Sequence, residues 1–393
     1  MRVALGAAAL LAVARIAPAQ TPEPPSLGPT WTDVAYPKLF WTPRDGLTVG
    51  GYYALIAPLG FADFERPPAY RGALTLNGQV STSGSRELLV EARLPDLFRG
   101  WRVVATLNAQ RRARENYFGI GNTASYDPAN ATPAQEHFYR SLNVRLMARG
   151  EIQRQVIGPL RVLAGVHAER WRVDTLPGPS QLRLDLLAGR DPTITRPTNE
   201  VAFRAGLVFD ARDSEPAPRR GVLIEAIHSV ADPDIAGDLQ YQRTTVSATA
   251  YVSVIPQLVL AARVAGERMA GTPRLGSYYV MEASDRPFFA LGGAASHRAL
   301  YQNRFLGRSK LLANFDVRYD VFAVPTLAYL TVVAFVDAGR VFETEVFEVT
   351  TRDLKVGGGA GLFLQFGRAA ILGTTVGKGP DGITAQAHTK WSF

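Results

Sequence analysis

The 393-residue sequence contains no cysteine, and this absence excludes disulfide bridges and thiolate metal sites. It also agrees with an exported protein, without proving export. Beyond the N-terminus no run of 18 uncharged apolar residues occurs. Ordinary transmembrane helices are therefore excluded, but membrane β-strands are not, because their alternating pattern keeps the average hydropathy near zero.

Motifs of common enzyme classes are also missing. No G-x-S-x-G nucleophile elbow occurs, so we expect no serine hydrolase of that type. The segment Gly373 to Lys378 falls short of a phosphate-binding loop, because three residues instead of four separate its glycines and no Ser or Thr follows the lysine. The histidines lack metal-ligand spacing and are His137, His167, His228, His297 and His388. We therefore expect neither catalysis nor a cofactor nor a metal, although His388 can still serve in a polar network.

The net charge of +8 is basic, but the cations are not gathered into blocks. A basic excess is one signature of nucleic-acid binding. Here the charges are spread along predicted strands and loops, which favours a basic lumen or rim and no nucleic-acid partner. Three aspartates of one predicted loop, Asp232, Asp234 and Asp238, offer oxygens for Ca²⁺, but a solvated loop is the better interpretation.

The N-terminus has the pattern of an export signal. Arg2 precedes an apolar stretch from Val3 to Ala14, and Ala17-Pro18-Ala19 forms a small-x-small cleavage site. Residues 20–32 are rich in proline and predict an extended periplasmic linker. We therefore expect a signal peptide at 1–19, a linker at 20–32 and one β-domain at 33–393.

Alternation with period two dominates the rest of the chain. In Trp101 to Arg111, Arg102 and Asn108 share one face while Trp101 and Leu107 share the other. Strict alternation predicts strands with a different solvent on each face. The sixteen predicted strands are 34–41, 47–56, 70–80, 87–94, 101–111, 138–148, 160–171, 201–210, 222–230, 241–254, 258–266, 314–319, 333–339, 356–366, 369–377 and 382–393.

An even number of such strands predicts an all-β, 16-stranded antiparallel transmembrane barrel, polar inside and apolar outside. The register is strongly determined, since a Lys or Arg on the lipid face costs about 2–4 kcal/mol at mid-membrane. Periplasmic turns are short and outer loops long in such barrels. The longer connections, which we expect outside or folded inward from that side, are 113–135, 174–199, 231–240, 271–308 and 344–353.

In the last predicted strand, Gly382 to Phe393, the alternation continues to the final residue. Thr384 and His388 belong to one face, and Ile383, Trp391 and Phe393 belong to the other. We expect this second face to contact lipid.

Three motifs carry a family resemblance. A long loop opens with Leu291-Gly292-Gly293 and contains Arg298, followed by Arg304-Phe305. The next strand contains Asp316-Val317-Arg318, and the one after it contains Phe335-Val336-Asp337-Ala338-Gly339. Together these motifs resemble the BamA/TamA family of outer-membrane assembly barrels. The chain departs from the family pattern at Ala299, where a glycine is usual, and at Leu300, where an aromatic residue is usual.

The resemblance implies a long loop that folds back into the barrel lumen. Arg298 and Asp337, joined by Asp316 and Arg318, would then form a latch that fixes this loop to the barrel wall. The alternative is a solvated Arg298 and an ordinary lumen carboxylate at Asp337. Trp391 and Phe393 resemble the terminal aromatic signal that the assembly machinery reads on exported barrels.

The resemblance also implies a function. Family members carry periplasmic POTRA domains, and residues 20–32 are too few for one, so we expect a short member without them. The expected role is assembly, insertion or translocation of polypeptide or lipid-linked cargo in the bacterial outer membrane. Expected partners are outer-membrane lipids, lipopolysaccharide, nascent outer-membrane proteins and periplasmic chaperones, with a monomeric barrel. The alternatives are a passive pore or structural barrel and, less favoured, an adhesin that presents its outer loops.

Overall fold

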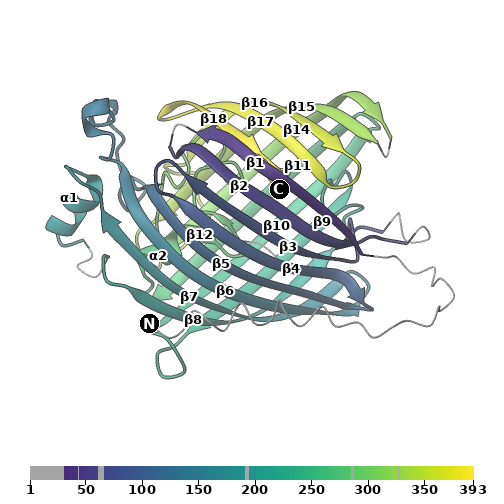
Figure 1. Ribbon diagram of the computed structural model, residues 1–393, viewed down its shortest axis with the longest axis horizontal. Helices are drawn as coiled ribbons and strands as arrows, with labels where there is room; N and C mark the ends of the chain where they lie inside the picture. The colour runs from purple at the N-terminus through teal and green to yellow at the C-terminus, as the bar shows by residue number, and fades with distance from the viewer. Residues whose placement is uncertain (1–30, 43, 61–65, 191–193, 285–286, 326) are drawn as a thin grey trace.

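The computed structural model describes residues 31–42, 44–60, 66–190, 194–284, 287–325 and 327–393. Sixteen strands form one antiparallel sheet that curls into a cylinder (Figure 1). The expected signal peptide and most of the expected linker lie outside the described residues. No helix in the described part of the chain is both long and apolar enough to cross a bilayer.

Each strand of the sheet pairs with its sequence neighbour, except that β11 pairs with β14 across a long loop. The strands of the sheet are β1 (Thr32–Thr42), β2 (Gly46–Ala57), β3 (Gly72–Ser81), β4 (Arg86–Phe98), β5 (Trp101–Asn116), β6 (Arg140–Ile157), β7 (Leu160–Thr175), β8 (Thr198–Asp210), β9 (Gly221–Ala231), β10 (Tyr241–Ile255), β11 (Leu258–Gly271), β14 (Ser309–Val324), β15 (Ala328–Phe342), β16 (Lys355–Phe366), β17 (Ala370–Gly379) and β18 (Gly382–His388). The predicted all-β fold with sixteen antiparallel strands is confirmed.

Burial follows the predicted alternation. On β5, Arg102 and Asn108 are buried on the lumen side, whereas Trp101 and Leu107 are exposed on the outside. Because the outer row would contact lipid, its apolar side chains lie where a bilayer stabilises them. The faces predicted for this strand are therefore confirmed.

The connections differ in length at the two ends of the cylinder. The longest of them, residues 272–308 between β11 and β14, is called the lumen loop here. It contains α2 (Leu275–Tyr278) and a small hairpin of β12 (Val280–Met281) and β13 (Phe288–Phe289). Buried residues of this loop pack against wall residues, which places the loop inside the barrel as the resemblance implied. A further helix, α1 (Gln181–Leu187), lies in the connection between β7 and β8.

The final strand is shorter than predicted. β18 ends at His388, and residues 389–393, called the tail here, leave the sheet. At the other end of the sheet, β1 pairs only with β2. Within the described residues no ladder joins β1 to β18, so both strands are edges of the sheet.

Candidate functional site

The structure brings together Arg298, Asp316, Arg318 and Asp337, the four residues predicted to form the latch. The Arg298 guanidinium donates from Nε to Asp337 Oδ2 (2.9 Å) and from Nη2 to Asp337 Oδ1 (2.7 Å). Its Nη2 also lies 2.6 Å from Asp316 Oδ1. Arg318 in turn donates to Asp316 Oδ2 from Nε (3.1 Å) and Nη2 (3.0 Å). All four side chains are buried, so the alternative of a solvated loop arginine is wrong.

The strand register explains this geometry. Asn314 on β14 is the cross-strand partner of Asp337 on β15, and its amide donates to Asp337 Oδ1 (2.7 Å). The same amide donates to the carbonyl of Ser296 in the lumen loop (2.8 Å). Phe335, two residues from Asp337 and on the same face, lies under the Arg298 guanidinium at 4.1 Å. The wall thus presents a carboxylate, an amide and an aromatic face to one arginine.

The barrel wall has glycine residues where the lumen loop packs against it. A Cβ atom at Gly357 of β16 would lie 2.5 Å from the Ala299 Cβ, and one at Gly377 of β17 would lie 3.0 Å from it. The first distance is shorter than real Cβ contacts and the second is unusually tight, so these glycines permit the close approach of the loop. Ala299 and Leu300, the two departures from the family pattern, are buried in this contact and in the neighbouring apolar cluster.

The remaining predicted motif residues fix the two ends of the inward-folded segment. Leu291 and Phe305 form an isolated antiparallel bridge and share one apolar cluster. Gly292 has a φ of +122°, a conformation that residues with a side chain rarely adopt. Arg304 lies 2.6 Å from Asp381 in the turn between β17 and β18. The loop is therefore joined to the last hairpin of the sheet as well as to β14 and β15.

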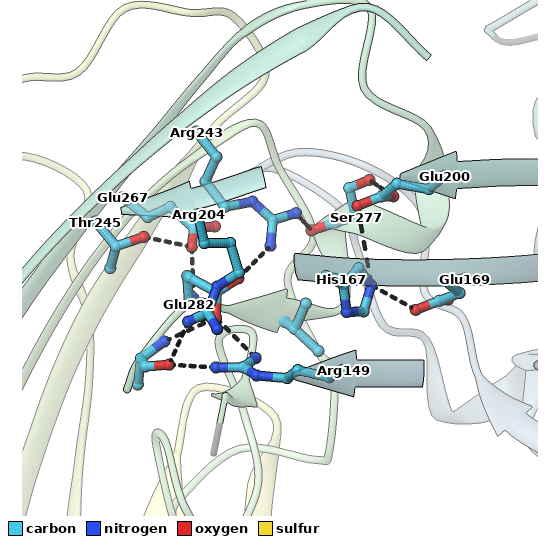
Figure 2. A network of polar contacts seen from close by, with 12 residues as sticks. Arg149, His167, Glu169, Glu200, Arg204, Arg243, Thr245, Glu267, Ser277 and Glu282 are labelled. Atoms are coloured by element: carbon cyan, nitrogen blue, oxygen red, sulfur yellow. Dashed lines mark hydrogen bonds and ion pairs between the residues drawn. The ribbon is translucent and has the colours of Figure 1, made fainter. Parts of the chain in front are cut away.

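A second anchor of the lumen loop was not predicted. Figure 2 shows Glu282 of the loop surrounded by arginines from three different strands. Arg149 Nη1 donates to its Oε1 at 2.8 Å, Arg204 Nη2 donates at 2.9 Å, and Arg243 Nη1 lies 3.9 Å from Oε2. We call these four residues the glutamate anchor. No local pattern in the sequence marks Glu282 as the partner of these arginines.

The electrostatics of the glutamate anchor favour a charged Glu282. Burial alone would raise the pKa of this carboxyl, but Arg149, Arg204 and Arg243 outweigh burial and lower the pKa to about 2. A neighbouring buried pair, Lys310 and Glu267, lies 2.5 Å apart, and Glu267 accepts from the backbone N–H of Glu282 at 2.7 Å. The segment around Glu282 is therefore held by both charge and backbone contacts.

The prediction for the final aromatic residues was wrong. Instead of contacting lipid, Trp391 stacks on the lumen-facing Phe363 with ring centroids 4.4 Å apart, and the Arg318 guanidinium lies 4.3 Å from its ring. The Phe393 ring lies 5.3 Å from Arg318 and 4.9 Å from Arg263. The physical reason is competition, because buried guanidiniums and an aromatic wall offer these rings contacts inside the barrel. The lumen position of Trp391 and Phe393 therefore gives no support to the expectation that they form a terminal assembly signal on the outer face of the last strand.

Other candidates from the sequence have ordinary contacts. His388 is hydrogen-bonded to Thr375 Oγ1 across 2.9 Å, as part of a lumen network. Asp232 accepts from the backbone N–H of Asp234 and so stabilises its own turn. Asp238 accepts from the backbone N–H of Asn199 at the start of β8 and so holds the loop to that strand. Within the described residues no group of three or more His, Cys, Asp or Glu is arranged to hold a metal ion.

Comparison with solved structures supports the fold. A structure titled BamA from Haemophilus ducreyi lacking POTRA domains 1–3 matches with a TM-score of 0.52 and 12% identity, over 91% of this chain and 68% of that chain. CdiB from Escherichia coli matches with a TM-score of 0.56 and 13% identity, over 94% of this chain and 64% of that one. No curated protein matches the chain by sequence.

The family follows from a sequence match that covers most of the barrel. The Omp85 superfamily domain matches residues 75–372, which include both anchors of the lumen loop. Together with the fold, this match places the protein in the outer membrane of Gram-negative bacteria. The chain belongs to the Omp85 superfamily.

Proposed function

We propose that this protein helps to insert or translocate polypeptide or lipid-linked cargo at the outer membrane, through a seam between β1 and β18. The single observation that carries this proposal is the edge of β1, which pairs with β2 alone among the described residues. An unpaired edge strand presents a row of backbone N–H and C=O groups that can template an incoming strand.

The composition of β1 supports this role. β1 is eleven residues long, whereas β18 has only seven, so a closed seam would leave part of β1 without a partner. Leu39 and Trp41 are among the most exposed large apolar residues of β1, at 71% and 66%. A long edge with exposed apolar residues is a liability that proteins usually cover, unless the edge has a partner.

The filled lumen argues against the alternative of a passive pore. The loop latch holds the lumen loop to β14 and β15, the glutamate anchor holds it to β6, β8 and β10, and the tail occupies further space. An open pore requires none of these contacts. We therefore propose that the lumen contacts keep the barrel interior closed, while the edge of β1 remains available for pairing with an incoming strand.

We further propose that the protein is non-enzymatic and monomeric. Its partners would be outer-membrane lipids, lipopolysaccharide, nascent outer-membrane proteins and periplasmic chaperones. The outer row of apolar side chains supports the lipid contact, and the free edge of β1 supports the contact with nascent strands.

Depletion in cells tests the proposal. A role in assembly predicts reduced levels of other outer-membrane barrels before permeability changes, whereas a pore predicts altered solute permeability alone. A variant with one engineered cysteine on β1 and one on β18 makes the test sharper, because their disulfide locks the seam. The chain has no cysteine of its own, so no other disulfide can form within it. Rescue by the reduced variant and not by the oxidised one supports the seam. Equal rescue by both forms refutes it.

A further inference from the structure

A row of arginines crosses the outer face of the strands β4 to β7, which lie side by side in the barrel wall (Figure 1). In the strand register Arg86, the first residue of β4, is the direct partner of Arg111 on β5. The row continues through Val144 of β6 to Arg172 of β7. Because Leu88 lies on the same face of β4 as Arg86 and is exposed, the row faces away from the lumen. We call Arg86, Arg111 and Arg172 the arginine row.

The arginine row lies near the end of the barrel that carries the long connections. Beyond the row, β5 and β7 are followed by the connections 117–139 and 176–197, whereas the turns at the opposite ends of these strands are residues 99–100 and 158–159. Outer loops are long in outer-membrane barrels, so the row belongs to the outer leaflet. Close to the interface an outward arginine costs little, and the phosphate groups of lipids lie in this interfacial region.

The centre of the arginine row has no carboxylate partner. Among the residues that the structure describes, the side chain of Arg86 makes no hydrogen bond or ion pair, and Arg111 donates to the backbone carbonyl of Gly84. Arg172, at the end of the row, lies with Nε 2.9 Å from Asp174 Oδ2. Like charges directly opposite each other on two strands are destabilising. The pair of Arg86 and Arg111 therefore favours an anion from outside the chain.

The next row of register partners, one step closer to the membrane centre, is mostly apolar. It runs from Leu88 of β4 through Ala109 of β5 to Leu146 of β6, and the two leucines are 50% and 61% exposed. Its member on β7 is Arg170, an exposed arginine that has no ion pair within the described residues. Guanidiniums above exposed leucines suit an amphiphile, because a soluble anion uses only the guanidiniums.

We propose that the arginine row binds the phosphate groups of a phosphorylated glycolipid of the outer leaflet, with Leu88 and Leu146 against its acyl chains. A phosphate monoester has acceptor oxygens for two guanidiniums at once, so one phosphate bridges Arg86 and Arg111 and offsets their repulsion. Arg170 and Arg172 supply cations for a second phosphate of the same lipid.

This inference gives the lipopolysaccharide partner proposed above a place on the barrel. It rests on the outer-membrane location and on that proposed lipid partner, and it does not depend on the seam. The arginine row lies on β4, β5 and β7, whereas the seam experiment alters β1 and β18. Failure of the seam experiment therefore leaves this site standing, and failure of the site leaves the seam standing.

Binding of labelled lipid A, the phosphate-bearing membrane anchor of lipopolysaccharide, tests the site. The full chain in maltoside micelles is titrated with fluorescent diphosphorylated lipid A, and binding is followed by fluorescence anisotropy. The test variants are Arg86→Gln alone and Arg86→Gln combined with Arg111→Gln. Arg154→Gln is the matched control, because Arg154 also faces outward but lies at the opposite end of the barrel, 4.9 Å from the ring of Trp101. Dephosphorylated lipid A and inorganic phosphate are the comparison probes.

We expect the Kd of diphosphorylated lipid A to rise about threefold in Arg86→Gln and about tenfold in the double variant, and to stay unchanged in Arg154→Gln. Lipid A should also raise the temperature of the gel-mobility shift in the unaltered chain more than in the double variant, because a ligand stabilises the state that binds it. The single variant carries the test if the double variant does not fold.

Three results would overturn the proposal. Equal affinity of the unaltered chain and the Arg86→Gln variants for lipid A would show that the arginine row does not bind it. Equal affinity for dephosphorylated lipid A would exclude recognition of phosphate. Displacement of lipid A by inorganic phosphate at a similar concentration would show a site for free anions, in which the leucines have no part.

Discussion

Replacing Arg298 by alanine removes the guanidinium that joins the lumen loop to the wall. Asp337 then loses two charge-assisted hydrogen bonds, while the backbone N–H of residue 298 (2.7 Å) and the Asn314 amide remain as donors to it. Asp316 keeps Arg318. Breaking a buried ion pair costs about 3–5 kcal/mol. Because both carboxylates retain donors, we expect a loss at the lower end of this range, about 3 kcal/mol. This corresponds to a factor of roughly 100–200 in the equilibrium between the bound and the released lumen loop.

The assay combines limited proteolysis of the lumen loop with heat-modifiable gel mobility. We expect faster cleavage within residues 272–308 and a lower temperature of the mobility shift, with normal insertion into the membrane, because the strand ladders do not involve Arg298. Arg340→Ala is the control, since Arg340 faces the mostly exposed Asp353 and an exposed pair contributes about 0–1 kcal/mol. If Arg298→Ala matches Arg340→Ala in both measurements, the latch does not hold the loop.

Three further predictions concern other parts of the molecule. The pKa of Glu282 is lowered to about 2 from its ordinary value of 4.5, so the glutamate anchor stabilises the bound lumen loop fully above about pH 4.5, and this stabilisation is lost as the pH falls towards 2. Cleavage of the loop by an acid-active protease should therefore rise over that pH range in the unaltered chain and stay constant in Glu282→Gln. Gly357→Val should displace the loop from the wall, because its Cβ would lie 2.5 Å from that of Ala299; a spin label on the loop should become more mobile, and unchanged mobility would contradict the close packing. Phe203→Arg, on the outer face of β8, should destabilise the barrel by about 2–4 kcal/mol relative to Phe203→Ala in urea unfolding from vesicles, and equal midpoints would show that this face does not contact the bilayer core.

The strands could be predicted because their pattern is local. On β5 the alternation between Arg102 and Trp101 identifies a strand and its two faces without knowledge of any other residue. The loop latch was accessible through the motif around Arg298 and Asp337, and the register of β14 and β15 then supplied Asn314. The glutamate anchor was not accessible, because Arg149 and Glu282 are 133 residues apart and neither stands in a recognisable motif.

The tail is the clearest case in which the sequence pattern did not predict the structure. Alternation from Gly382 to Phe393 is compatible with one strand to the final residue, yet β18 ends at His388. The outcome depends on Arg263, Arg318 and Phe363, which come from three different strands and meet only when the sheet curls.

Alternation was enough to predict the sixteen strands of the sheet and the two faces of a strand such as β5, since side-chain alternation along a strand is set by neighbouring residues. What fills the barrel interior follows from the folded sheet. Curling the sheet brings lumen-facing charges and rings from distant strands within contact distance, and the lumen loop and the tail are held by groups that are not neighbours in the chain.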